Sequence, residues 1–276
     1  MSGSHGVTRR PWLSKTFSDD HLMARLEKRV ALLTGAASGI GRAAALAFAA
    51  EGARLALADI NEEALVSLAA ALRRTGAEVL WHAVDLCQPS AVHETVENVA
   101  SAYGRIDVLF NNAGIDLKRA IEETSEEDWD RVMAVNVRSM FLLCKNSVPH
   151  MVRAGGGSIV NVSSAAALIP VAGRPAYVAS KGAVVALSRS LALDLAPKNI
   201  RVNCICPGAV RTPLLLGDIE RAVDPQAALA AVISRYPLRR LAEPEEVAQV
   251  VVFLASQESS YMTGATLAVD GGRTMH

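Results

Sequence analysis

A glycine-rich stretch near the N-terminus, TGAASGIG over residues 34–41, separates two segments of contrasting character. The residues before it, 29–33, are mostly apolar and have the length of a buried parallel strand. The residues after it, 42–51, are rich in alanine, which predicts a helix. A strand, a glycine turn and a helix start form a cradle for anions, because the turn exposes N–H groups and the helix N-terminus carries about half a positive charge.

Each glycine of this stretch has its own expected task. Gly35 permits the tight exit from the strand, Gly39 lets the backbone approach a pyrophosphate, and Gly41 lets the helix pack against the sheet. Ser38 and Ile40 are further candidate cofactor contacts. The spacing Gly-x-x-x-Gly-x-Gly differs by one residue from the commoner dinucleotide fingerprint, so the stretch alone also fits an ordinary glycine loop.

Short apolar segments and helix-like segments alternate along the rest of the chain. This alternation predicts right-handed crossovers and an α/β fold, with helices on both faces of a doubly wound parallel sheet. The expected strands are 29–33, 54–58, 79–84, 106–110, 158–162, 200–205 and 263–269. The expected helices are 42–51, 61–74, 90–103, 126–153, 177–196 and one that opens at Pro244, whereas 213–237 shows no regular pattern.

An acidic residue, Asp59, stands at the tip of the second expected strand, 24 positions after Gly35. A carboxylate there accepts hydrogen bonds from an adenosine ribose and repels a 2′-phosphate. The residue before Gly39 is Ser38, not a basic residue that would favour that phosphate, so we expect NAD rather than NADP. Asp59 also fits a helix cap for the segment from Asn61; we favour the ribose because of the glycine loop upstream.

Other expected strands are followed by suitable residues at the same end. Residues 85–86 follow the third strand and suit an adenine edge, and residues 111–114 end the fourth. Ligands of open parallel sheets bind beyond the carboxyl ends of the strands, so the sequence predicts one site there. The candidate contacts at this edge are Asp59, Ile60, Asp85, Leu86, Asn112, Ala113 and Gly114.

Length and composition limit the classes of function. The 276 residues, 51% of them hydrophobic, suffice for one sizeable globular domain. A formal net charge of zero gives no reason to expect a nucleic acid or an anionic membrane as partner. The apolar runs are far shorter than the ~20 residues that cross a bilayer. The cysteines and histidines show no metal-binding spacing, so we expect no metal site and reduced thiols in a cytoplasmic protein.

The first 27 residues differ from the rest of the chain. They are polar and irregular, which predicts a flexible N-terminal extension with one short helical turn around 22–26. The tripeptide Thr8-Arg9-Arg10 resembles part of an export signal, but the apolar segment that such a signal requires is missing. The catalytic domain is therefore expected over residues 28–276.

Two residues suited to proton transfer, Tyr177 and Lys181, lie four positions apart and therefore on one face of an expected helix. A surface tyrosine stacked on a lysine stem has the same spacing. Asn136 lies inside the expected helix 126–153, although asparagine is a poor mid-helix residue. On its own, Asn136 fits a partly exposed surface side chain.

Together, these segments resemble the short-chain dehydrogenase/reductase family over about residues 28–272, in the family's order. The resemblance implies a single Rossmann-type domain with about seven parallel strands. It rests on Thr34 to Gly41, Asp59, Asp85, Asn111 to Gly114, Asn136, Ser164, Tyr177-x-x-x-Lys181, Pro207-Gly208-x-Val210-x-Thr212 and Asp270-Gly271-Gly272.

The resemblance implies a catalytic tetrad of Asn136, Ser164, Tyr177 and Lys181, with Tyr177 as the general acid and base. Ser164 is favoured over Ser163 because the family places its serine 13 positions before the tyrosine. An ordinary tyrosine pKa of ~10 is too high for a base at neutral pH, and we expect the Lys181 ammonium and the positive nicotinamide of the oxidised cofactor to lower it together. Ser164 would bond the substrate oxygen, and Asn136 would hold a water that links Lys181 to solvent.

The resemblance also assigns the segments that surround the tetrad. Residues 213–237 would form a substrate lid, and the two long helices that hold Asn136 and Tyr177 would pair in a homotetramer, since both carry apolar residues on more than one face. The further implied cofactor contacts are Tyr177, Lys181, Pro207, Gly208, Val210 and Thr212. An apolar pocket wall would consist of Ala165, Ala166, Leu168 and Val171, although ordinary loop packing explains these four almost equally well. Asp116, Lys118 and Arg211 could meet a polar or acidic group of a substrate, but we expect them at the surface.

The expected activity is hydride transfer between NAD(H) and a small-molecule secondary alcohol or ketone. One alternative is the NADPH-dependent reduction of a 3-oxoacyl thioester, which Asp59 disfavours. The other is a non-catalytic NAD-binding sensor or scaffold, which has no need for Ser164, Tyr177 and Lys181 together.

Overall fold

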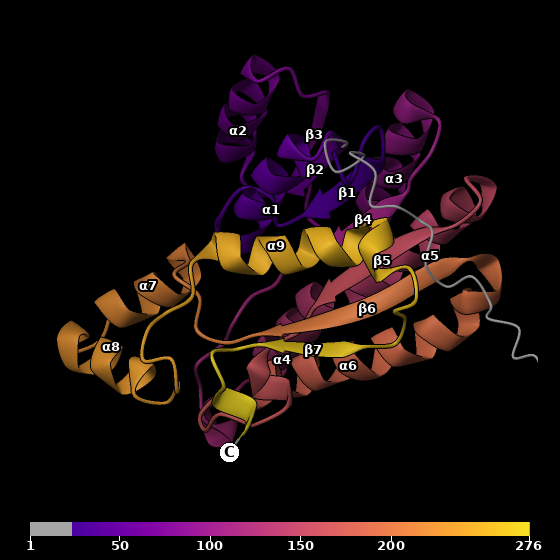
Figure 1. Cartoon of the computed structure of the whole chain (residues 1–276). Coiled ribbons are helices and arrows are strands. Elements are labelled where there is room, and N and C mark those ends of the chain that lie inside the picture. The colour runs from indigo at the N-terminus through magenta and orange to yellow at the C-terminus, as the bar shows by residue number, and fades with distance from the viewer. Residues whose placement is uncertain (1–23, 276) are drawn as a thin grey trace, which may run out of the picture.

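Every residue of the first strand, β1 (Val30–Thr34), is buried, as expected for a strand between two layers of helices. The computed structural model describes residues 24–275. Its sheet is parallel throughout and has the order β3-β2-β1-β4-β5-β6-β7, which confirms the doubly wound α/β fold (Figure 1). The other strands are β2 (Arg54–Asp59), β3 (Val79–Ala83), β4 (Val108–Asn111), β5 (Gly157–Val162), β6 (Ile200–Pro207) and β7 (Thr266–Val269).

Helices cover both faces of this sheet. One face packs against α1 (Gly39–Ala50), α2 (Glu62–Arg74) and α9 (Pro244–Ala255). The other packs against α3 (Pro89–Tyr103), α5 (Ser139–Arg153) and α6 (Pro175–Leu195). Three more helices, α4 (Glu126–Met133), α7 (Pro213–Glu220) and α8 (Pro225–Ile233), belong to the connections, and α7 and α8 lie beyond the carboxyl ends of the strands (Figure 1).

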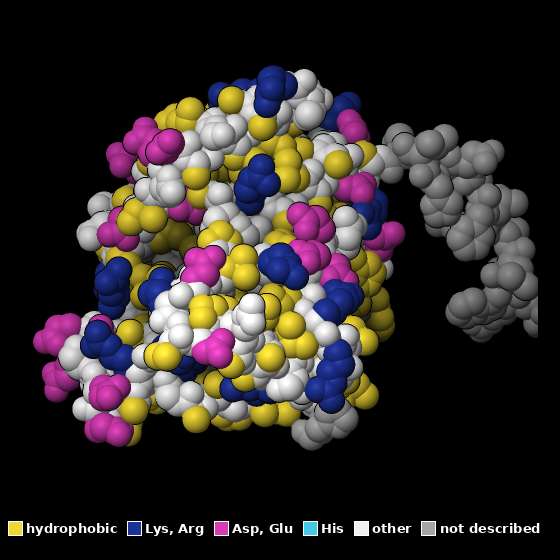
Figure 2. Space-filling model, turned by 90° about the vertical axis from the view of Figure 1, so that its left-hand side faces the viewer, with side chains coloured by type: hydrophobic (Ala, Val, Ile, Leu, Met, Phe, Trp, Pro, Cys, Tyr) yellow, Lys and Arg dark blue, Asp and Glu magenta, His cyan; other side chains and the backbone are white. Residues whose placement is uncertain are grey.

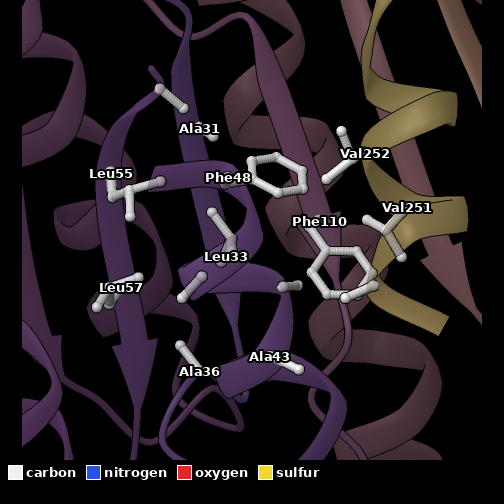
Figure 3. Close-up of a cluster of buried hydrophobic side chains, with 14 of the residues drawn as sticks. Ala31, Leu33, Ala36, Ala43, Phe48, Leu55, Leu57, Phe110, Val251 and Val252 are labelled. Atoms are coloured by element: carbon white, nitrogen blue, oxygen red, sulfur yellow. The ribbon is translucent and has the colours of Figure 1, made fainter. Parts of the chain in front are cut away.

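Alternate residues of β1 enter the two halves of the core, because successive strand side chains point to opposite faces. Leu33 packs with Phe48 of α1, Phe110 of β4 and Val251 of α9, as Figure 3 shows. Leu32 enters the other half, with α3, α5 and α6. Both halves are apolar, so the sheet is fixed between them and the strand ends are held at defined positions.

The expected helix 126–153 is not one regular helix. A π-helical turn, η3 (Ala134–Arg138), separates α4 from α5. Turns of this kind are rare and are often found at functional sites. Asn136 lies within it and is fully buried, so the interpretation as a surface side chain was wrong.

The expectation of irregular structure over 213–237 was also wrong, because α7 and α8 occupy most of this segment. Two caps that are readable in the sequence explain both helices: Thr212 accepts from Leu215 N before Pro213, and Asp224 accepts from Ala227 N before Pro225.

The end of the expected N-terminal extension belongs to the domain. Leu26 is fully buried, and the Arg25 guanidinium donates to Glu51 at 2.9 Å from its Nε. Residues 24–27 therefore pack against the domain instead of extending from it. The rest of that prediction concerns residues 1–23, which lie outside the described residues.

Candidate active site

The turn between β1 and α1 has the geometry of an anion cradle. Gly35 and Gly39 have φ of 62° and 51°, in the left-handed region that favours glycine. The N-cap of α1, Ser38, makes no side-chain cap hydrogen bond, so its side chain leaves the first N–H groups of the helix free. A Cβ on Gly41 would lie 1.9 Å from the Gly35 carbonyl oxygen. Gly41 thus lets the helix approach the loop itself, whereas the sequence suggested contact with the sheet.

The end of β4 holds this loop in place. The Thr34 hydroxyl accepts from the backbone N–H groups of Asn112 and Ala113, at 3.1 and 3.2 Å. The Asn112 side chain donates in return to the carbonyl oxygens of Thr34 and Gly35, both at 3.0 Å. Sequence reasoning assigned Asn112 to the cofactor and missed that Thr34 and Asn112 form a clamp between two strand ends.

Asp59 links the end of β2 to the same loop. One carboxylate oxygen accepts from Ala37 N at 2.9 Å, and the other accepts from Asn61 N at 3.0 Å. Asn61 itself caps α2, because its side chain accepts from Ala64 N. The cap that Asp59 could have supplied is therefore provided by Asn61, and Asp59 lies beside the anion cradle.

The π-helical turn brings Asn136 to the loop after β4. Its amide nitrogen donates to Ile115 O at 2.9 Å and to the Ser180 hydroxyl at 3.0 Å, and its oxygen accepts from Ile115 N at 2.8 Å. A Cβ on Gly114 would lie 3.2 Å from both Asn136 Oδ1 and Lys181 Nζ, so glycine keeps that space open. Both amide hydrogens of Asn136 are thus used within the protein, which accounts for a polar residue in the helix interior.

The first two turns of α6 place Tyr177 and Lys181 on one side. Lys181 Nζ is buried, donates to Val162 O at 3.0 Å, and lies 5.8 Å from the centre of the Tyr177 ring. Ser164 is within hydrogen-bonding reach of Tyr177. Ser163 donates instead to Lys181 O at 2.7 Å from a buried position. The two serines therefore have different partners: Ser164 faces Tyr177, and Ser163 bonds the backbone of Lys181.

Burial dominates the electrostatics of this pair. It raises the pKa of Tyr177 to about 12, with Ser164 opposing the rise, and it lowers the pKa of Lys181 to about 8. In the protein alone, Lys181 does not offset the effect of burial on Tyr177; the expected lowering of the pKa of Tyr177 also involves the positive nicotinamide.

These parts line one cavity of about 630 Å³. Figure 2 views the molecule from the side on which α7 and α8 lie in Figure 1 and shows a hollow in the molecular surface there. All the predicted catalytic and cofactor-binding residues line this cavity except two. Gly41 supports the loop, and Asn136 lies behind Gly114. Of the expected apolar wall, Leu168 does not line the cavity and is 39% exposed. The predicted residues that line it are Gly35, Ser38, Gly39, Ile40, Asp59, Ile60, Asp85, Leu86, Asn112, Ala113, Gly114, Ser164, Ala165, Ala166, Val171, Tyr177, Lys181, Pro207, Gly208, Val210 and Thr212.

Charged residues that the sequence analysis missed or misplaced line the other end of the cavity. The expectation that Asp116 lies at the surface was wrong, since its side chain is only 9% exposed. It pairs with Arg174, which also faces Asp218 of α7 at 3.7 Å. By contrast, Arg211 is exposed and pairs with Glu243, as its expected surface position implies. Arg174 immediately precedes α6, three residues before Tyr177, which was the one available signal.

Two further kinds of site were sought over residues 24–275. No cluster of three or more potential metal ligands occurs among them. None of the helices in this part of the chain is long and apolar enough to cross a membrane.

Comparisons with known proteins give consistent matches over this whole region. A family model described as enoyl-(acyl carrier protein) reductase matches residues 35–274. The 3-oxoacyl-[acyl-carrier-protein] reductase FabG of Thermotoga maritima is 44% identical and covers 90% of this chain and 98% of its own length. The structure of L-sorbose reductase from Gluconobacter frateurii complexed with NADPH and L-sorbose has a TM-score of 0.88 at 35% identity, with 92% and 100% coverage. The structure of NAD+-bound xylitol dehydrogenase has a TM-score of 0.86 at 37% identity, with 90% and 100% coverage.

Proposed function

Since this chain belongs to the short-chain dehydrogenase/reductase family of oxidoreductases that act on CH–OH groups, we propose that it transfers hydride between NAD(H) and a secondary alcohol or ketone, with Tyr177 as the general acid and base. One observation carries the proposal: Ser164, Tyr177 and Lys181 line the same cavity as the glycine loop and Asp59. The similar solved structures, named for xylitol and for L-sorbose, are consistent with such substrates.

Each polar group then has a defined task. In the oxidation direction, Tyr177 acts in its deprotonated form, and its phenolate oxygen accepts the proton of the substrate hydroxyl while hydride leaves the carbinol carbon. The Ser164 hydroxyl donates to the substrate oxygen and steadies its developing charge. Lys181 supplies positive charge one helical turn from Tyr177 when it is protonated. The nicotinamide, when bound, supplies the hydride acceptor and a second positive charge beside the phenol.

The residues present fit a dinucleotide. The left-handed Gly35 and Gly39, the uncapped start of α1 and the clamp by Asn112 form a rigid donor-lined turn suited to a pyrophosphate. The proposed preference for NAD over NADP rests on the Asp59 carboxylate, which Ala37 N and Asn61 N hold beside the glycine loop. A 2′-phosphate there would meet a negative charge.

Initial-rate assays test the proposal directly. We expect reduction of NAD, followed by absorbance, with a panel of secondary alcohols that includes polyols and cyclic alcohols, and a higher kcat/KM for NAD than for NADP. Tyr177→Phe should remove turnover and keep NADH binding, measured by the fluorescence of the bound cofactor. A Tyr177→Phe variant with wild-type turnover would refute the acid/base role.

A second activity, the NADPH-dependent reduction of a 3-oxoacyl thioester, is favoured by the 44% identity to the Thermotoga maritima reductase. A higher kcat/KM with NADPH than with NADH, measured on an acetoacetyl thioester, would establish this second activity. A non-catalytic NAD-binding protein is the remaining alternative. Cofactor binding without turnover of any alcohol or ketone in the panel would support that role.

We also propose a homotetramer and a cytoplasmic location. On the two long helices, Leu143, Val184 and Val185 belong to the core, but Phe141 on α5 is 47% exposed and is available for contact with another subunit. A monomer by light scattering at micromolar concentration would contradict the tetramer. The four cysteines are free thiols, which supports a reducing compartment and is testable by cell fractionation.

A further inference from the structure

Three charged side chains from three separate segments meet at the end of the cavity that faces α7. Asp116 follows β4, Arg174 precedes α6, and Asp218 lies on α7. The Arg174 guanidinium donates to Asp116 Oδ2 through one nitrogen, and its other terminal nitrogen lies 3.7 Å from Asp218 Oδ2. We refer to Asp116, Arg174 and Asp218 as the charged cluster.

One carboxylate oxygen of the charged cluster has no hydrogen-bond donor among the described residues. Asp116 Oδ1 is buried and has no hydrogen-bond partner among residues 24–275, while its side chain is 91% buried. Burial of this kind raises the pKa of Asp116, and Arg174 opposes the rise. A buried carboxylate oxygen without a donor is costly, so native proteins rarely keep one unless a ligand or water completes it.

The position of Asp116 points to a ligand next to the reaction centre. Asp116, Arg174 and Tyr177 all line the cavity. The Asp116 carboxylate is near enough to Tyr177 for its charge to raise the pKa of that phenol. A donor that reached Asp116 would therefore belong to the same molecule whose hydroxyl faces Tyr177.

The charge balance favours a neutral donor. Asp218 also accepts a hydrogen bond from Arg221 at 2.7 Å. The negative charges of Asp116 and Asp218 are therefore balanced by the positive charges of Arg174 and Arg221. An ammonium group would in addition meet Arg235 and Arg273, which line the cavity. A hydroxyl group donates a hydrogen bond without adding a charge, and it can accept one in return from Arg174.

We propose that Asp116 Oδ1 accepts a hydrogen bond from a second hydroxyl group of the substrate, so that the enzyme prefers diols and polyols to alcohols with a single hydroxyl group. This inference rests on the proposed function, because it assigns a substrate class to the same cavity. Asp116 is then the residue that sets specificity, and Arg174 orients its carboxylate through Oδ2.

The test compares cyclohexanol with the 1,2-, 1,3- and 1,4-cyclohexanediols, which share one carbon skeleton. A diol has two reactive hydroxyl groups, so a twofold excess in kcat/KM is statistical. For at least one diol we expect an excess of about tenfold or more, the size expected for a hydrogen bond to a charged group. Asp116→Leu should reduce the ratio of diol to cyclohexanol to about two, and Asp116→Asn, which keeps an acceptor oxygen, should give an intermediate ratio.

Asp128→Asn is the matched control, because it removes the carboxylate of another aspartate–arginine pair, with Arg119, that does not line the cavity. Its diol ratio should equal that of the wild type. Circular dichroism and NADH binding establish that each variant is folded; if Asp116→Leu is not, Asp116→Asn and the wild-type ratios still decide.

The inference is overturned if no diol exceeds cyclohexanol by more than twofold, if Asp116→Leu keeps the wild-type ratio, or if a hydroxy acid is preferred to every diol. Absence of turnover with every alcohol, with either cofactor, would instead refute the proposed function.

Discussion

Replacing Lys181 by methionine should remove activity and stabilise the fold. Burial lowers the pKa of Lys181 to about 8 from an ordinary 10.5, which means that the folded protein disfavours the charged form. Each pKa unit corresponds to about 1.36 kcal/mol, so folding with a protonated Lys181 costs about 3 kcal/mol at pH 7. Methionine keeps the apolar stem but loses the 3.0 Å hydrogen bond from a charged donor to Val162 O, worth about 2 kcal/mol. The expected net gain is about 1 kcal/mol.

The sign of the pH dependence separates this explanation from better packing by methionine. Below pH 8 both folded and unfolded wild type hold the Lys181 proton, and the cost is present in full. Between pH 8 and 10.5 the unfolded state binds more protons, so the free energy of unfolding of the wild type rises with pH relative to the variant. At pH 9 about 2 kcal/mol of the cost remains, and the advantage of Lys181→Met should shrink by about 1 kcal/mol.

Urea denaturation at pH 7 and pH 9 measures both quantities, at one protein concentration because subunit association would shift the midpoint. Lys198→Met is the control, since Lys198 is exposed and its replacement should change stability little at either pH. The reasoning fails if Lys181→Met is less stable than the wild type at pH 7, or if its advantage does not change between the two pH values.

Three other predictions follow from the site. Tyr177→Phe should lower kcat by about 10²–10⁴-fold. In the wild type, the raised pKa of Tyr177 should make kcat/KM for oxidation increase with pH; a pH–rate series should show that the variant has lost this increase. Gly41→Ala should destabilise the fold by about 1–3 kcal/mol or more in urea, because its Cβ would collide with a backbone oxygen at 1.9 Å, whereas Gly217→Ala on α7 meets only the flexible end of a side chain and should be tolerated. Asp59→Asn should shift the kcat/KM ratio of NADP to NAD upward by tenfold or more, and an unchanged ratio would remove the basis for NAD preference.

The sheet and the cofactor end of the cavity could be predicted because they follow from local pattern. A parallel βα alternation forces all carboxyl ends to one edge, so Gly35, Asp59 and Asn112 had to lie close together wherever the helices packed. The spacing of Tyr177 and Lys181 fixed their common face in the same way.

The charged cluster could not be predicted by such rules. The burial of Asp116 depends on Arg174, 58 residues later, and on α7, whose start is marked only by a capping threonine and a proline. The π-helical turn around Asn136 is likewise a product of packing, because its hydrogen bonds to Ile115 and Ser180 exist only in the assembled domain.

The same removal from water that makes Lys181 costly also explains why Tyr177 needs help to act as a base. Burial moves the two pKa values in opposite directions, to about 12 for the phenol and about 8 for the ammonium, so at pH 7 the protein alone holds a neutral phenol beside a protonated Lys181. A positive charge entering the cavity lowers the pKa of Tyr177 by attraction. On the proposed function, the positive charge of an oxidised dinucleotide would therefore add to that of Lys181 in lowering the pKa of the proposed base.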